Sequence, residues 1–128
     1  MENERYLRGL NKFKEYTAAT NHDINEDKKI PDPLDDIAPD FRRMIIEFAY
    51  GDIYSRPGLD NKQRALVTIA SLVTQGVEKQ LETHINRGLT AGLTQTEVTE
   101  AILQLVPYVG FPRVQNALGV AKKVFQKS

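Results

Sequence analysis

Apolar residues recur at intervals of three and four along most of the chain, which is the spacing of amphipathic α-helices. No segment shows the strict alternation typical of a strand, and no repeat of fixed period is visible. The pattern therefore predicts an all-α bundle of about six helices. We expect helices over residues 2–18, 35–51, 60–75, 77–91 and 95–108, and a last helix opened by Pro112.

The stretch 59–92 carries the strongest helix signals. Asp60 and Gln63 form a capping-box signature at its start, and Gly76 interrupts it. The first of its two helices has apolar residues on almost every side, which is typical of a core helix. These residues are Leu66, Val67, Ile69, Ala70, Leu72 and Val73.

The second helix of this stretch brings a histidine to the edge of an apolar stripe. The stripe is formed by Val77, Leu81, Ile85 and Leu89, spaced by four. His84 lies three residues after Leu81, so it borders the stripe. A histidine in this place is either a structural residue satisfied by a backbone carbonyl or a general acid/base in an apolar pocket. Burial lowers an imidazole pKa and a nearby carboxylate raises it, so such a site can be poised near neutral pH.

Three further apolar faces are expected to be buried. They are Tyr6, Leu7, Leu10, Phe13 and Tyr16; Phe41, Met44, Ile45, Phe48 and Ala49; and Val98, Ala101, Ile102, Leu105 and Val106. Gly51 is expected to end the second helix. Pro107 should fall near the end of the helix that the Thr94 and Glu97 capping box opens, where its missing N–H costs little.

Composition narrows the protein class. The chain has 17 basic and 17 acidic residues and no run of about 18 apolar residues, so neither nucleic acid nor a membrane is an expected partner. We expect one domain over 1–128, with an N-terminal helix over 1–19, a linker over 20–34 and a core over 35–128. The start of the chain has no apolar signal core, which favours a cytoplasmic protein. His22 lies in the linker, where adjacent loop residues form a poor metal site.

Two segments carry a family resemblance. LDNKQRALVTIASL and QLETHINRGLTAGLTQTEVTEAILQLVPYVGFPRVQNAL resemble the carboxymuconolactone decarboxylase family, which includes the alkylhydroperoxidase-D-like proteins. The resemblance implies the helical bundle of that group and assembly as a trimer or hexamer. It also implies that His84 is the active-site histidine.

Three positions near His84 depart from the family's pattern. Peroxidase-like members have cysteines seven and four positions before the histidine, and these positions are Val77 and Gln80 here. Many decarboxylase-like members have a glutamate at the second position. The glutamate expected in the central helix is Ala65 here. Gln80 can still hydrogen-bond His84 or a ligand from one turn away.

The loop YSRPGLD, which resembles the family's loop near the pocket, precedes the central helix. Arg56 can grip a carboxylate through two parallel hydrogen bonds, although a local ion pair is the alternative role. Tyr108 lies at the predicted interruption between the last two helices, where its side chain would either join the core or line the pocket. We predict His84 as the catalytic residue and Tyr54, Arg56, Gln80 and Tyr108 as substrate-binding residues, with no metal and no cofactor.

Two functions stay open at this point. The first is a cofactor-free decarboxylase of a small carboxylated lactone or keto acid, in which Arg56 holds a carboxylate and His84 moves a proton. The second is a catalytically reduced family member that binds a small ligand or only builds a homo-oligomer. His84 favours the first function, and Ala65 and Gln80 favour the second.

The absence of cysteine gives a first testable prediction. A dithiol peroxidase needs a thiolate nucleophile, and the sequence contains none. Metal-free protein supplied with a dithiol donor should therefore reduce hydroperoxides no faster than the donor alone. The measurement is the rate of peroxide consumption. A rate well above that of the donor alone would contradict the prediction.

Overall fold

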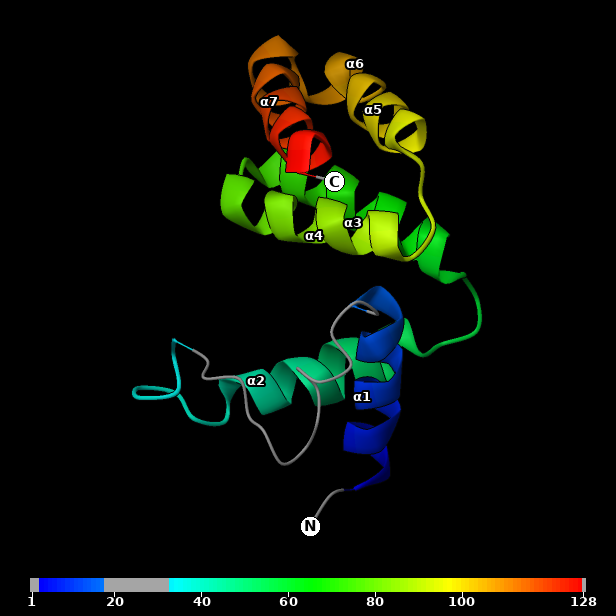
Figure 1. The fold of residues 1–128 in the computed structure, drawn as a ribbon, viewed down its shortest axis with the longest axis vertical. Coiled ribbons are helices and arrows are strands. Elements are labelled where there is room, and N and C mark those ends of the chain that lie inside the picture. Colours follow the sequence, from blue (N-terminus) through cyan, green and yellow to red (C-terminus); the bar gives the residue numbers. More distant parts are fainter. Residues whose placement is uncertain (1–2, 18–32, 128) are drawn as a thin grey trace. The chain divides into compact units, whose positions relative to one another are not determined.

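The computed structural model describes residues 3–17 and 33–127, and each regular element in these ranges is a helix (Figure 1). The all-α prediction is confirmed. Contacts group the chain into an N-terminal unit, Met1–Leu59, and a C-terminal unit, Asp60–Ser128. A single domain over 1–128 stays a prediction. Most of the expected linker, including His22, lies outside the described residues.

The N-terminal unit consists of one α-helix packed on a second, partly π-helical one. Helix α1, Glu4–Tyr16, begins after Asn3, whose side chain accepts the Tyr6 backbone N–H at 2.7 Å. Helix α2, Phe41–Met44, runs directly into the π-helix η2, Ile45–Tyr54. Gly51 therefore lies within a helix, and the prediction that it ends one is wrong.

The predicted buried face of this second helix is also wrong. Ile46, Tyr50 and Gly51 are buried, whereas four residues expected inside are 37–60% exposed. These four are Phe41, Met44, Ile45 and Phe48. Hydrogen bonds in a π-helix span five residues instead of four, which widens the turn. From Ile45 onward, a face derived from α-helical spacing consequently points in the wrong direction.

Two glycines allow α1 and η2 to meet backbone to backbone. A side chain at Gly9 would collide with the carbonyl oxygen of Ile46, and one at Gly51 would collide with that of Arg5. Leu10 and Ile46 form a small core beside this crossing, with Tyr6 and Phe13 packed against it. Helix η2 thus covers Leu10 of the α1 stripe, while Leu7 is 44% exposed. We expect another subunit to bury part of this stripe, and that stays a prediction.

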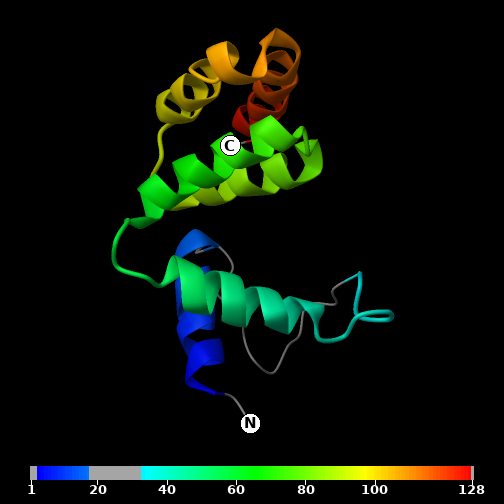
Figure 2. The same cartoon turned by 180° about the vertical axis from the view of Figure 1, so that it is seen from behind.

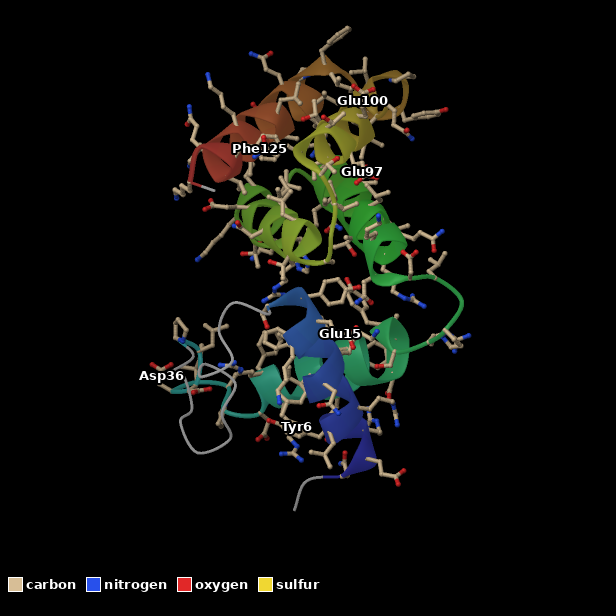
Figure 3. The ribbon with its side chains drawn as sticks, turned by 45° about the vertical axis from the view of Figure 1, so that its right-hand side comes forward. Tyr6, Glu15, Asp36, Glu97, Glu100 and Phe125 are labelled. Carbon is tan, nitrogen blue, oxygen red and sulfur yellow. The ribbon has the colours of Figure 1, made fainter. Side chains whose placement is uncertain are left out.

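Charged side chains reinforce this helix pair at its surface. Arg5 donates to both carboxylate oxygens of Asp52, at 3.0 and 2.8 Å, and Arg8 donates to the carbonyl oxygen of Gly51 at 2.9 Å. The Arg43 guanidinium lies 4.5 Å from the ring centre of Tyr6, which Figure 3 labels on α1. These contacts help to hold α1 in one register on η2.

The C-terminal unit is a helical bundle in which α3 and α4 lie side by side (Figure 2). Its helices are α3, Asn61–Gln75; α4, Glu78–Thr90; α5, Gln95–Leu103; α6, Val106–Val109; and α7, Phe111–Lys127. Both predicted capping boxes are present, at Asp60 with Gln63 and at Thr94 with Glu97. Gly76 ends α3 with a left-handed φ of 73°, so the predicted break between α3 and α4 is confirmed.

The core of this unit uses one face of each long helix. It is formed by Ala65, Ile69, Val73, Leu81, Ile85, Leu93, Val98, Ile102, Val114, Ala117, Val120, Ala121 and Val124. Helix α3 buries Ala65, Ile69 and Val73, spaced by four, while Val67 is 61% exposed. Within its unit, α3 is therefore amphipathic, unlike the all-round buried helix that the sequence predicted.

The helix predicted over 95–108 is split in two. Helix α5 ends at Leu103, and Pro107 lies in the first turn of the short α6. Pro107 has no N–H to donate to the Leu103 carbonyl, and its ring would clash with that carbonyl in a continuous helix. The proline thus ends the first helix well before its own position.

The crossing of α1 and η2 predicts an unusual response to alanine. Gly9→Ala gains helix propensity of about 1 kcal/mol but drives a methyl group into the Ile46 carbonyl, so it should destabilise the protein by about 1–3 kcal/mol. Gly119→Ala on α7 is the matched control, since no atom lies within 4 Å of the added methyl. Denaturant unfolding and hydrogen exchange of the α1 amides measure both. Equal stability of the two variants would argue against the close crossing.

Candidate functional site

His84 lies in the middle of α4, at the edge of the buried face. Leu81, Ile85 and Gly88 on this helix are buried, and His84 is half-buried beside them. It follows Leu81 by three residues and precedes Gly88 by four, so these side chains are neighbours on the helix. The predicted place of His84 on the border of the apolar stripe is confirmed.

Gly88 brings α4 close to α3 next to this histidine. A side chain at Gly88 would begin 3.5 Å from the Ala65 Cβ, 3.6 Å from the Ile69 Cδ1 and 3.0 Å from the Leu93 Cδ1. Ala65 itself is only 5% exposed. A glutamate at position 65 would have to enter this packed contact, and burying a carboxylate there is costly. The alanine therefore completes the contact between the helices instead of leaving space at the site.

The imidazole of His84 is held in its neutral form. Burial first, and the positive charge of Arg87 second, lower the pKa of His84 to about 4. At pH 7 one ring nitrogen can consequently accept a proton while the other donates a hydrogen bond. Arg87 is absent from the predicted site residues, although its spacing of three from His84 is a signal that the sequence contains.

Two predicted substrate-binding residues share the C-terminal unit with His84. Gln80 lies one turn before it on α4 and is exposed, and Tyr108 on α6 is 81% exposed. Among the described residues, no hydrogen bond joins either side chain to His84. Their substrate-binding role stays a prediction.

The other two predicted binding residues belong to the N-terminal unit. Tyr54 is the last residue of η2, and its ring centre lies 4.8 Å from that of Tyr50 and 5.5 Å from that of Tyr16. Arg56 is exposed in the following turn, where its backbone N–H donates to the Ile53 carbonyl at 3.1 Å. Tyr54 is thus part of an aromatic cluster in its own unit.

A hollow of about 310 Å³ lies between the end of α3, the start of α4 and the start of α7. Leu72, Val73, Gly76, Val77, Glu78, Leu81, Pro112, Arg113, Asn116 and Ala117 line it. A more open one of about 440 Å³ lies along α7 and includes Thr99 of α5 and Phe125, which Figure 3 labels. Neither hollow includes His84 or Gln80 in its lining.

Within residues 3–17 and 33–127, no three histidine, cysteine, aspartate or glutamate residues group in a way that could hold a metal ion. None of the helices there is long and apolar enough to cross a membrane.

Comparison with known proteins decides the family. The model of the carboxymuconolactone decarboxylase family matches residues 39–123, which include α3, α4 and His84. The chain belongs to this family. The predicted resemblance is therefore confirmed.

Three relatives show the range of this family's members. The 4-carboxymuconolactone decarboxylase of Acinetobacter baylyi is 40% identical over 93 residues, covering 73% of this chain and 69% of the relative. An uncharacterized 15.0 kDa protein from the nqo9-nqo10 intergenic region of Paracoccus denitrificans is 34% identical over 94 residues, covering 72% and 70%. The nitrosuccinic acid decarboxylase of Metarhizium robertsii is 35% identical over 82 residues, covering 64% and 57%. Two of the three relatives are thus named as decarboxylases.

The low pKa of His84 predicts a loss of stability in acid. The pKa is about 4 in the folded protein and 6.5 in its ordinary state, so the unfolded chain binds more protons between these values. Stability should fall as the pH drops from 6.5 toward 4, and His84 should contribute no pH dependence above that window. After allowance for solvent screening of a partly exposed ring, the loss should be about 1 kcal/mol.

Urea unfolding at pH 7 and pH 4.5 measures this loss, and His84→Gln should remove it. The comparison uses the change between the two pH values, so a constant packing defect in the variant cancels. An NMR titration of the ring protons reads the pKa directly. A value near 6.5 would contradict the assigned burial.

Proposed function

We propose that the protein is a decarboxylase of a small carboxylated lactone or keto acid, working without a metal or organic cofactor. The observation that carries the proposal is the half-buried His84, which has a lowered pKa and lies within the part of the chain that matches the family. The family resemblance implies that it is the active-site histidine. Two related proteins named as decarboxylases support the reaction class. The class of substrate, a small carboxylated lactone or keto acid, is part of the proposal.

In the proposed reaction, the bond between carbon and the departing carboxylate breaks as carbon dioxide leaves. The electron pair stays on the carbon and spreads into the neighbouring carbonyl group. A proton must then be added to that carbon. His84 is neutral in the free protein, but a bound anion raises the pKa of a nearby imidazole. His84 would take up a proton from solvent when substrate binds and deliver it to the carbon.

A second candidate function is binding without turnover. Ala65 lies in a packed contact at the position where the family resemblance implies a glutamate, and the exposed Gln80 does not hydrogen-bond His84. Both observations favour a member whose site retains the histidine but not a proton relay. In this case the same surface would hold a small carboxylate and release it unchanged.

The proposal includes the substrate-binding residues and the assembly of the protein. Arg56, Tyr54, Gln80 and Tyr108 are the proposed substrate-binding residues, and a homo-oligomer, either a trimer or a hexamer, is the proposed assembly. Support for an assembly comes from apolar side chains that are 37–60% exposed along α2 and η2, since large exposed apolar surfaces mark interaction sites. These are Phe41, Met44, Ile45 and Phe48.

Substitution of His84 tests the proposed reaction. With 4-carboxymuconolactone as substrate, His84→Gln should lower the rate of carbon dioxide release by about 100-fold or more, since a positioned proton donor contributes that much. Glu82→Gln is the matched control. Glu82 lies two residues away, pairs with Lys127 at 3.8 Å and should be dispensable.

The possible results separate the two candidate functions. Turnover that survives in His84→Gln would refute the catalytic assignment. Wild-type protein that binds 4-carboxymuconolactone without releasing carbon dioxide would favour the binding function. Circular dichroism of each variant verifies that the helices are intact.

A further inference from the structure

The hollow of about 310 Å³ between α3, α4 and α7 has an apolar floor and a polar rim. Leu81 and Ala117 in its lining are 1% and 2% exposed, so the floor belongs to the packed core of this unit. The polar part of the lining is exposed and consists of Glu78, Arg113 and Asn116. Small-molecule sites usually have volumes of about 300–1,000 Å³, so this hollow suits a small ligand.

Arg113 places its guanidinium against the end of α3. Gly76, which caps α3, has a left-handed φ of 73°, and a Cβ added there would collide with Nη1 of Arg113 and lie 3.4 Å from its Cζ. The missing side chain at Gly76 therefore leaves room for the guanidinium beside the hollow, which both residues line.

The hydrogen-bond donors of this guanidinium are unused within the part of the chain that the structure describes. A guanidinium has five N–H donors, and no hydrogen bond or ion pair joins Arg113 to another residue in 3–17 or 33–127. This holds even for Glu78 in the same lining. Asn116 follows Arg113 by three residues on α7, so its amide lies on the same side of the helix.

We propose that this hollow binds a small aliphatic monocarboxylate, with the carboxylate on Arg113 and Asn116 and the alkyl group on the apolar floor. A guanidinium matches a carboxylate with two parallel hydrogen bonds, and the amide of Asn116 can add a third. Glu78 would repel a second negative charge on the ligand, which favours a monocarboxylate over a dicarboxylate. The site goes beyond the proposed reaction, because its lining contains neither His84 nor a predicted substrate-binding residue.

An NMR titration with isovalerate tests the proposal, with isovaleramide as the uncharged counterpart. The methyl signals of Leu72, Val73 and Val77 report on the hollow, and the ring of His84 reports separately on the other candidate site. Isovalerate should shift the three methyl-bearing residues, and isovaleramide should bind at least tenfold more weakly. Acetate should also bind at least tenfold more weakly, because it buries less apolar surface.

Substitutions at the rim identify the groups that recognise the carboxylate. Arg113→Gln should weaken isovalerate binding at least tenfold, and Arg113→Lys should weaken it less, since lysine keeps the charge but not the paired hydrogen bonds. Glu78→Gln should strengthen binding severalfold, because it removes a like charge. Lys123→Gln is the matched control, since it removes an exposed positive charge from α7 outside the lining of the hollow.

The alternative role of Arg113 is structural, because a cation near the carboxyl end of α3 stabilises the helix dipole. In that case Arg113→Gln would lower the unfolding midpoint in urea without changing the Kd of the folded protein, and the proposal would be overturned. Equal affinity for isovalerate and isovaleramide, shifts confined to the His84 ring, or no shift of the three methyl-bearing residues would also overturn it. Decarboxylation that survives His84→Gln would refute the proposed reaction and leave this site unaffected.

Discussion

The packing of α4 against α3 around Gly88 is the constraint on which the C-terminal unit depends. A Cβ added at Gly88 would make ordinary van der Waals contact with Ala65 and Ile69 and would lie only 3.0 Å from the Leu93 Cδ1, so there is no room for a larger side chain. Leu81 and Ile85 of the same helix belong to the core, and His84 lies at the border of the packed region. The environment of the histidine is thus a result of helix packing, since its nearest core neighbours are apolar.

That environment sets the protonation state of His84 in a chain that has Ala65 and Gln80 at the two positions where the family resemblance implies acids. A carboxylate beside an imidazole would favour its charged form, whereas burial and Arg87 favour the neutral form. The neutral form of the His84 imidazole at pH 7 is therefore a consequence of burial first and of the positive charge of Arg87 second.

Much of the fold was predictable because its signals are local. The capping boxes at Asp60 and Thr94 and the left-handed Gly76 fix helix ends through short-range hydrogen bonds that a sequence displays. The π-helix was not predicted, because the apolar spacing was interpreted with the α-helical period and a π-helix has a wider turn. For the site, His84 could be identified from its place beside the stripe and from the resemblance, but the packing of Ala65 against Gly88 depends on contacts between helices. The influence of Arg87 depends on how far the ring is buried.

Gly9 of α1 and Gly51 of η2 also fix the register of the two helices. Gly9 faces the Ile46 carbonyl while Gly51 faces that of Arg5, so sliding one helix along the other by a single residue would bring a side chain against a backbone at two places. Sliding is therefore blocked in both directions. An insertion or deletion within either helix would shift this register, so it should not be tolerated. A change of length in the segment that connects α1 to α2 leaves the register unchanged and should be tolerated.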